Sequence, residues 1–165
     1  MTLATPLLTW PGRTNEEWRR SSLSPFALET LKPAAPSKSA PKALPRDAQF
    51  AGKITFVDGV MTGLELDPEL KKKGVVFGPH SDAPELVKKH LALGLSKADT
   101  LASSGHYSRI EFGLVLSVPA KVVIEVPFLV ELVENRSDLI TVPHFVMALG
   151  EISQSSLVFR QSSPK

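Results

Sequence analysis

Four histidines are the side chains in this sequence best suited to bind a metal ion or to move a proton near neutral pH. They are His80, His90, His106 and His144. Two histidines bind one zinc ion from a helix face when they are spaced as His-x-x-x-His, and no pair in this chain has that spacing. His90 falls on the apolar side of a predicted helix, where it would be a half-buried packing residue, and His144 falls in a predicted strand. We therefore predict that none of the histidines is a metal ligand.

The other side chains with catalytic potential lack the partners that catalysis requires. Glu125 and Glu131 could share one face of a strand, but an acid–base pair also needs a cleft, and outward-facing charges on a half-buried sheet are the simpler interpretation. The serines of 153–156 are not in a Gly-x-Ser-x-Gly motif, and no glycine-rich phosphate loop occurs. The sequence contains no cysteine, so it has no thiolate nucleophile, disulfide or cysteine-bound cluster. We predict no catalytic residue, leave any cofactor-binding residue undefined, and expect a protein that is not an enzyme.

The size and charge of the chain suit one small soluble domain. Its 165 residues, 42% of them apolar and 22% charged, are enough for one ordinary core. The net charge of +2 is too near balance for a nucleic-acid partner, and the lysine run 71–73 is expected to be a solvated helix end. The first ten residues lack the basic region of a signal peptide, and glutamates interrupt the most hydrophobic region. We expect a cytoplasmic protein with no nucleic-acid and no membrane partner.

Proline usage and hydrophobic period divide the chain into three segments. Residues 1–48 hold many of the fourteen prolines. Within them 15–20 favour a short helical turn, and 33–45 are predicted to be a linker without regular hydrogen bonds, because proline lacks an amide donor. Residues 49–108 are predicted to be a mixed α/β region. Residues 109–165 change to a period of two, which is typical of strands.

The mixed region carries clear local signals. Residues 53–57 and 60–66 are predicted to form a hairpin around Asp58-Gly59, a pair that tolerates positive φ angles. A single helical turn is expected over 68–73. Asp82-Ala83-Pro84-Glu85 is a helix-start pattern with the aspartate as the expected cap, and apolar residues continue behind it at helical spacing.

The third segment has the pattern of a β layer. Apolar residues alternate over 110–118 and again over 122–132, and 139–149 and 157–159 supply further strands. In several places the intervening residues are apolar too, so both faces of the strands are expected to be partly covered. A sandwich, a barrel and a coil of strands are all compatible with this pattern.

Four short motifs occur along the chain in a fixed order. They are Glu16-Glu17-Trp18-Arg19-Arg20-Ser21-Ser22-Leu23-Ser24-Pro25-Phe26, Gly74-Val75-Val76-Phe77 with Pro84-Glu85-Leu86-Val87-Lys88-Lys89-His90-Leu91, Val118-Pro119-Ala120-Lys121-Val122-Val123-Ile124-Glu125-Val126-Pro127, and Pro143-His144-Phe145-Val146 with Gly150-Glu151-Ile152-Ser153. Together they resemble SufD-type proteins of the SufB/SufD iron–sulfur cluster assembly family, over nearly the whole chain from Asn15 onward. Two places depart from the family pattern. Ala120-Lys121 stands where the family usually has Lys-Gly, and 100–109 lacks the usual aromatic-rich stretch.

The resemblance implies an α+β fold, in which a small mixed N-terminal region (hairpin plus helices) leads into the first coils of a right-handed parallel β-helix. It implies a non-catalytic scaffold component of iron–sulfur cluster assembly, truncated or split, since family members continue through more coils and a C-terminal helical domain. In the family a SufB-like β-helix protein is the partner, and a SufC-like ATPase docks on the C-terminal domain that is absent here. The family's cluster-forming residues lie beyond Lys165, so no site residue is carried over and no iron–sulfur cluster is expected on this fragment.

Two other functions remain open at the level of sequence. One is a small β-rich module that binds a protein or ligand unrelated to cluster assembly; the other is a small hydrolase using Glu or His, which the missing motifs disfavour. If the strands form a coil, its last turn would expose apolar residues over 139–160. The residues expected there are Val146, Leu149, Leu157 and Phe159, and we predict self-association or binding of a β-helix partner through them.

Overall fold

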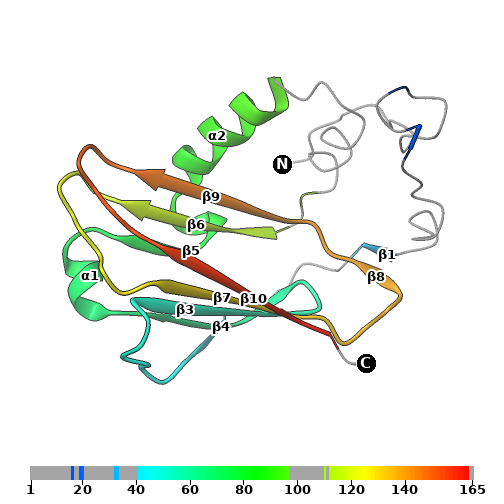
Figure 1. Cartoon of the computed structure of the whole chain (residues 1–165), viewed down its shortest axis with the longest axis horizontal. Helices are drawn as coiled ribbons and strands as arrows, with labels where there is room; N and C mark the ends of the chain where they lie inside the picture. The colour runs from blue at the N-terminus through cyan, green and yellow to red at the C-terminus, as the bar shows by residue number, and fades with distance from the viewer. Residues whose placement is uncertain are drawn as a thin grey trace.

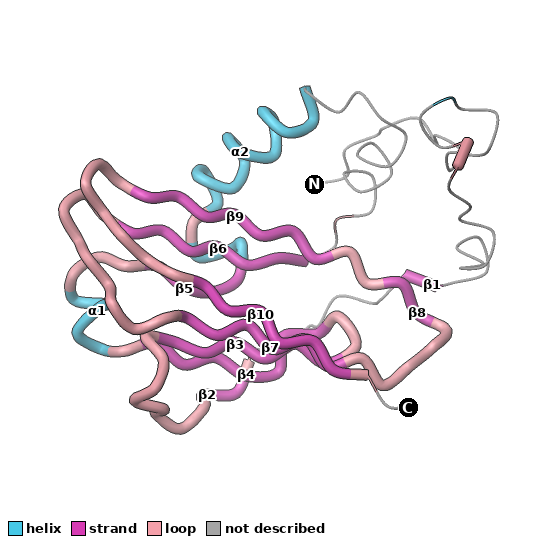
Figure 2. The backbone as a smooth tube through the Cα atoms, in the orientation of Figure 1, coloured by secondary structure: helices cyan, strands magenta, loops and turns pink. Residues whose placement is uncertain are grey.

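The computed structural model describes residues 41–96, 110 and 112–163, together with positions 16, 19, 20, 32 and 33 (Figure 1). Within them the fold is mixed, with mostly strands and two α-helices, as the backbone in Figure 2 shows. The strands are β1 (Lys32–Pro33), β2 (Lys42–Ala43), β3 (Gly52–Val57), β4 (Val60–Leu66), β5 (Val76–Pro79), β6 (Phe112–Val118), β7 (Phe128–Val133), β8 (Leu139–Ile140), β9 (Pro143–Leu149) and β10 (Leu157–Ser162). The helices are α1 (Pro68–Lys72) and α2 (Pro84–Ser96), and a 3-10 turn covers His80–Asp82.

The predicted hairpin forms from β3 and β4. Asp58 and Gly59, between the two strands, have φ angles of 49° and 82°, values that glycine and aspartate accept at lower cost than most residues. The Asp58 carboxylate also accepts hydrogen bonds from the amides of Asn135 and Arg136, at 2.7 and 3.2 Å. The turn is therefore fixed both by its own backbone preference and by the loop that follows β7.

The predicted helical turn is α1, and residues at both of its ends favour helix termination there. Asp67 caps the helix by accepting a hydrogen bond from the amide of Glu69 at 2.9 Å, and Pro68 occupies the first turn. Gly74, with a φ of 82°, lies just past the last turn, where a left-handed residue commonly ends a helix.

The second predicted helix is α2, but its first turn differs from the predicted one. Ala83 is the residue directly before Pro84, so Asp82 does not occupy the position of the cap. Asp82 instead ends the 3-10 turn, and the amide of Val87 donates to the carbonyl of Ala83 at 3.0 Å. The proline still marks the start of the helix, because its missing amide has no partner to lose there.

Three sheets are built from the strands. The largest has the order β10-β7-β3-β4-β2, the second has the order β5-β6-β9, and β1 pairs with β8. Neighbouring strands are parallel except in the β3–β4 and β5–β6 pairs. Because β7 lies between β3 and β10, the early hairpin and the last strand belong to one continuous sheet (Figure 1).

An apolar core fills the space between the two larger sheets. Its fully buried members on the strands are Ile54, Phe56, Phe77, Leu114, Leu116, Val118, Phe128 and Val130. The rings of Phe77 and Phe128, from opposite sheets, meet with centroids 4.6 Å apart. Since alternate residues of a strand point to one face, the period of two in the sequence identifies this core face correctly.

A smaller apolar cluster covers the other face of β6 and β9. Val87 of α2 packs with Val115 and Val146, which are 0% and 4% exposed. Figure 1 shows α2 lying beside these two strands. Leu129 of β7 is also fully buried on the face away from the core. The expectation that both faces of these strands are partly covered is therefore confirmed.

Two consecutive stretches of chain stack on each other, strand upon strand. Segment A (112–133) contains β6 and β7, and segment B (143–162) contains β9 and β10. Phe112 pairs with Pro143, an offset of 31 (143 minus 112), and the pairing continues in register to the end of both strands. The β7–β10 pair is parallel and in register as well, with Phe128 opposite Leu157, an offset of 29 (157 minus 128). The chain therefore follows nearly the same path twice.

The corners that connect the strands within each segment also stack. Lys121 in segment A and Ile152 in segment B both have left-handed backbones, with φ of 64° and 57°, again 31 positions apart (152 minus 121). The amide of Lys121 donates to the carbonyl of Glu151 at 2.9 Å. A Cβ atom at Gly150 would lie 2.3 Å from the amide nitrogen of Ala120, so only glycine allows the two corners to approach this closely.

This corner overturns one predicted strand. The alternation over 122–132 predicted a strand from residue 122 onward, but β7 begins at Phe128. Before it, Val123 forms only an isolated parallel bridge with Gln154. The left-handed residue Lys121 turns the chain at this point, and the apolar alternation continues around the corner instead of along a strand.

The proline-rich part contains short strands where the sequence predicted a linker without regular hydrogen bonds. β1 pairs with β8, and β2 pairs with β4, so the prediction for 33–45 is wrong at residues 33, 42 and 43. Both strands lie at sheet edges, where a strand needs amide donors on one side only and neighbouring prolines are tolerated. The helical turn predicted over 15–20 lies mostly outside the described residues.

Candidate functional site

The open end of the stack is formed by β9 and β10 of segment B. Each of these strands is the last in its sheet within the described part of the chain. The outer edge of such a strand presents unpaired amide and carbonyl groups, which can pair with the strand of another chain. Since both strands belong to segment B, the two edges lie at the same end of the stack (Figure 1).

The rows of core side chains continue to the open end, where their last members are exposed. Met147, Leu149 and Phe159 are 41%, 48% and 50% exposed. Their partners in segment A are no more than 2% exposed; they are Leu116, Val118 and Val130. The ring of Phe159 also meets that of Phe145, with centroids 4.9 Å apart. Among the described strands, the open end therefore presents an apolar cross-section together with the outer edges of β9 and β10, which pair with no further strand.

Two of the four residues predicted to be exposed at this end are exposed. Leu149 and Phe159 are correct, Leu157 is half-buried against the core, and Val146 is buried beneath α2. The predicted exposure of Val146 is wrong because this residue lies on the opposite face of β9 from Leu149. Met147 was missed, although it shares its period of two with Leu149 and could have been found from that spacing.

The open end carries little charge. Between residues 145 and 163 the charged side chains are Glu151 and Arg160. Exposed edge strands usually avoid pairing by carrying lysine, proline or an inward-pointing charge. β9 begins with Pro143. After this proline, no lysine, further proline or inward-pointing charge interrupts the core-facing side chains of β9 and β10. The surface therefore has the composition of a contact site and not of a protected edge.

Glu131 lies on the outer face of the large sheet, where it is held by two cations. Its carboxylate is 2.7 Å from the Lys53 ammonium and 3.0 Å from an Arg160 guanidinium nitrogen, and it accepts a hydrogen bond from Thr55 at 3.3 Å. Burial by itself would raise the pKa of Glu131, but Lys53, Thr55 and Arg160 together lower it. A carboxylate held ionised by partners on the two neighbouring strands, β3 and β10, is a structural link and not a proton donor.

His80 and His144 are the two histidines that the described residues bring together. Their rings are 5.9 Å apart, edge to face, and Nε2 of His80 lies 2.8 Å from the carbonyl oxygen of His144. Gly113 makes room for them, because a Cβ atom there would lie 2.2 Å from the His80 ring. Burial lowers the pKa of His80, and hydrogen bonds to the backbone of His144 and Leu114 partly oppose it.

The remaining candidates lie apart from one another. His90 is half-buried on α2, as predicted, and the lysines 71–73 are exposed, as predicted. Glu125 is exposed in the loop before β7, so it does not share a strand face with Glu131. His106 lies outside the described residues. Across 41–96 and 112–163, no group of three or more His, Cys, Asp or Glu side chains is placed to hold a metal ion.

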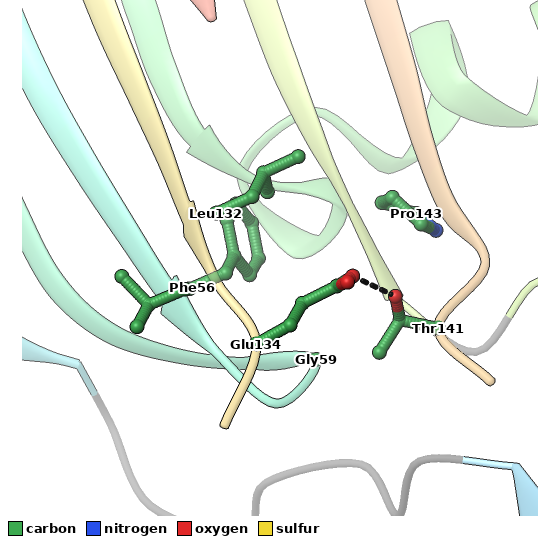
Figure 3. A pocket seen from close by; sticks show the side chains of 7 residues that line it. Phe56, Gly59, Leu132, Glu134, Thr141 and Pro143 are labelled. Atoms are coloured by element: carbon green, nitrogen blue, oxygen red, sulfur yellow. Dashed lines mark hydrogen bonds between the residues drawn. The ribbon is translucent and has the colours of Figure 1, made fainter. Parts of the chain in front are cut away.

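A small pocket lies between the end of β7 and the start of β9. Its lining includes Phe56, Leu132, Glu134 and Thr141, and the hydroxyl of Thr141 donates to the Glu134 carboxylate at 2.8 Å (Figure 3). Gln161 also donates to that carboxylate, at 3.4 Å. The pocket offers about 10 Å³ to the centre of a water molecule, which is room for roughly one water. It is too small to be a substrate site.

No protein-family model matches the chain, and no curated protein matches it. Among the described helices, none is long and apolar enough to cross a membrane. The open end of segment B is therefore the candidate functional site, on the strength of its own geometry.

Proposed function

We propose that this protein is a non-catalytic scaffold that binds through the open end of segment B. Segments A and B are, in this proposal, the first coils of a right-handed parallel β-helix. The partner is another β-helix protein of the SufB type or a second copy of this chain. The proposed role is SufD-like, in cytoplasmic iron–sulfur cluster assembly, with no catalytic residue and no cofactor on the described residues.

The observation that carries the proposal is the apolar cross-section at the open end. In-register parallel stacking of β9 on β6 and of β10 on β7 is the arrangement by which successive coils of a solenoid bury one another. A further coil, from whichever chain, would cover Met147, Leu149 and Phe159 and pair with the outer edges of β9 and β10, which are the last described strands of their sheets. A surface that gains both apolar burial and strand pairing from one partner favours a scaffold over an enzyme.

The SufD-like role is supported by where the family-like motifs lie in the fold. The stretch 118–127 forms the corner that leads from β6 to β7, and 84–91 form the start of α2. Lys121, at the position where the family usually has glycine, has a left-handed backbone. A family preference for glycine is expected at such a position. The departure from the family pattern is therefore compatible with a corner that favours glycine at this position.

A matched pair of variants tests the contact. Phe159→Lys places a charge within the apolar cross-section, whereas Val158→Lys places the same charge next to it on the opposite face of β10. We expect the wild-type chain to associate at tens of micromolar in sedimentation velocity, by the edge argument. Phe159→Lys should weaken association at least roughly tenfold, because burying a lysine charge without a partner is costly. Val158→Lys should change it much less.

Two results would separate the parts of this proposal. A compact monomer at these concentrations, unaffected by either lysine, would show that the open end is not a contact site. If the chain associates through the open end but does not co-elute with a SufB-like protein, or does not alter cluster assembly in a reconstituted mixture, the scaffold geometry stands and the SufD-like role is wrong.

A further inference from the structure

Residues 41–50 form a strap that covers the outer edge and outer face of β4, far from the open end in the order of the large sheet. The strap pairs with β4 as a parallel strand, with Lys42 opposite Gly63 and Ala43 opposite Leu64. The amide of Leu44 then donates to the carbonyl of Leu64 at 3.0 Å. The edge of β4 is therefore occupied by a short extended segment of the same chain.

The first side-chain contact of the strap is made by Leu44, whose aliphatic side chain packs against Gly63. We call the space above Gly63 the Gly63 notch. A Cβ atom added at Gly63 would lie 2.6 Å from Cδ2 of Leu44. Any side chain at Gly63 would consequently displace Leu44. The notch thus selects a branched aliphatic side chain at this position of the bound segment.

The second contact, two residues after Leu44, joins the Arg46 guanidinium to the side chains of Glu65 and Asp67. Arg46 donates from Nη2 to Asp67 at 2.9 Å, and its Nε lies 3.4 Å from Glu65. The Glu65 side chain is only 6% exposed, yet neither of its oxygens accepts a hydrogen bond from the described residues. Burial raises the pKa of Glu65, and Arg46 is the cation that opposes this rise.

The buried carboxylate of Glu65 is not expected to stabilise the fold. Leaving both of its oxygens without hydrogen bonds costs free energy, since a buried ionisable group needs partners. Glutamine or an apolar residue would pack there at lower cost. An acid at this position does, however, distinguish a bound segment that carries a cation from one that does not.

We propose that the edge of β4 is a strand-binding site, filled by the chain's own strap, which recognises an extended segment with an aliphatic side chain followed two residues later by a cation. Parallel pairing along Gly63–Leu64 supplies the backbone contacts, and the Gly63 notch and the Glu65–Asp67 pair supply the side-chain recognition. The site is independent of the function proposed for the open end. A partner segment of the same chemistry would bind by displacing the strap.

The test uses the full chain with the strap disabled by Leu44→Ser and Arg46→Gln, and a blocked peptide with the sequence of residues 41–48. In a ¹⁵N-HSQC titration, millimolar peptide should shift the amides of Gly63, Leu64 and Glu65 in the double variant. The wild-type chain should respond little, because its tethered strap competes at an effective concentration on the order of millimolar or above. A peptide with glutamine in place of Arg46 should bind roughly tenfold more weakly.

Several results would overturn the proposal. They are no shift at the three amides in the double variant, equal responses of the wild-type chain and the double variant, or equal binding of the two peptides. Dispersed amide signals from β7 show that the double variant is folded. If they are lost, Leu44→Ala alone provides the second variant, with the same expected order of responses.

Discussion

The imidazole of His80 lies over Gly113 and reaches the carbonyl of His144, so it joins the 3-10 turn to β9 across β6. Histidine is the residue type that most often binds metals or transfers protons, but the surroundings of His80 give it a packing role. Burial lowers the pKa of His80, which means that the folded state favours the neutral ring. The unfolded chain, with a pKa near the ordinary value of about 6.5, binds the proton more readily.

The sign of the resulting pH dependence follows from this difference. As the pH falls below about 6.5, protonation stabilises the unfolded chain first, so the free energy of unfolding decreases until the pKa of the folded state is reached. We predict that His80→Gln reduces this loss between about pH 7 and 5 and costs about 1 kcal/mol at pH 7, for the weakened contact. Urea unfolding at several pH values measures both effects.

His90→Gln is the matched control on α2, since His90 is half-buried. It should leave most of the pH dependence in place. An unchanged pH profile in His80→Gln would assign the effect to another group, and His144, whose ring faces His80, would be the next to replace.

Among the elements, the stacked corners show most clearly how the fold repeats. Gly150 lies against Ala120 with no room for a side chain, and its own φ is not in the left-handed region. Lys121 is left-handed but has room. A position favours glycine for one of two reasons, and each reason applies at one of these corners. At Gly150 the backbones approach too closely for a side chain, and at Lys121 the backbone is left-handed.

This separation gives opposite predictions for two single substitutions. Gly150→Ala should destabilise the fold by roughly 1–3 kcal/mol, because backbone atoms of the facing corner must move. Lys121→Gly should be neutral or stabilising by up to about 1 kcal/mol, because it relieves a left-handed non-glycine residue. Thermal and urea unfolding of the two variants check the order. Equal destabilisation by both would show that the corners do not stack as closely as described.

The elements that sequence alone predicted correctly are those with local causes. The Asp58-Gly59 turn, the helical turn α1 and the proline start of α2 each depend on a few neighbouring residues. The corner at Lys121 was missed because no glycine marks it, and the apolar alternation continues through it. The strands β1 and β2 depend on pairing with residues far along the chain, which no local pattern near the prolines indicates.

The candidate site could be predicted only in part, for a related reason. The apolar alternation of β9 and β10 located the open end, but the choice between two faces of β9 needed the position of α2 over Val146. The contacts of Glu65 with Arg46 had no sequence signal, since the two residues meet only after the strap folds back onto β4. A period of two shows which residues of a strand share one face. Which of the two faces is covered depends on the tertiary fold.

At the scale of the whole molecule, stability should decrease from segment A to segment B. Strands β6 and β7 have neighbours on both sides, whereas β9 and β10 each have a described neighbour on one side only. The side chains of segment A are also more deeply buried than the rows at the open end. Opening of the last strands therefore breaks fewer hydrogen bonds and exposes less apolar surface than opening of the first.

Hydrogen exchange tests this gradient and its link to association. At low protein concentration we expect amides of β9 and β10 to exchange faster than those of β6 and β7, by an order of magnitude or more, because local opening of an edge costs less than global unfolding. Raising the concentration should slow exchange in β9 and β10 specifically, since association stabilises what it covers. In Phe159→Lys the gradient should persist at all concentrations. Uniform protection of the four strands in the dilute wild-type chain would mean that the open end is already covered, and the candidate site would have to be sought at the edge of β4.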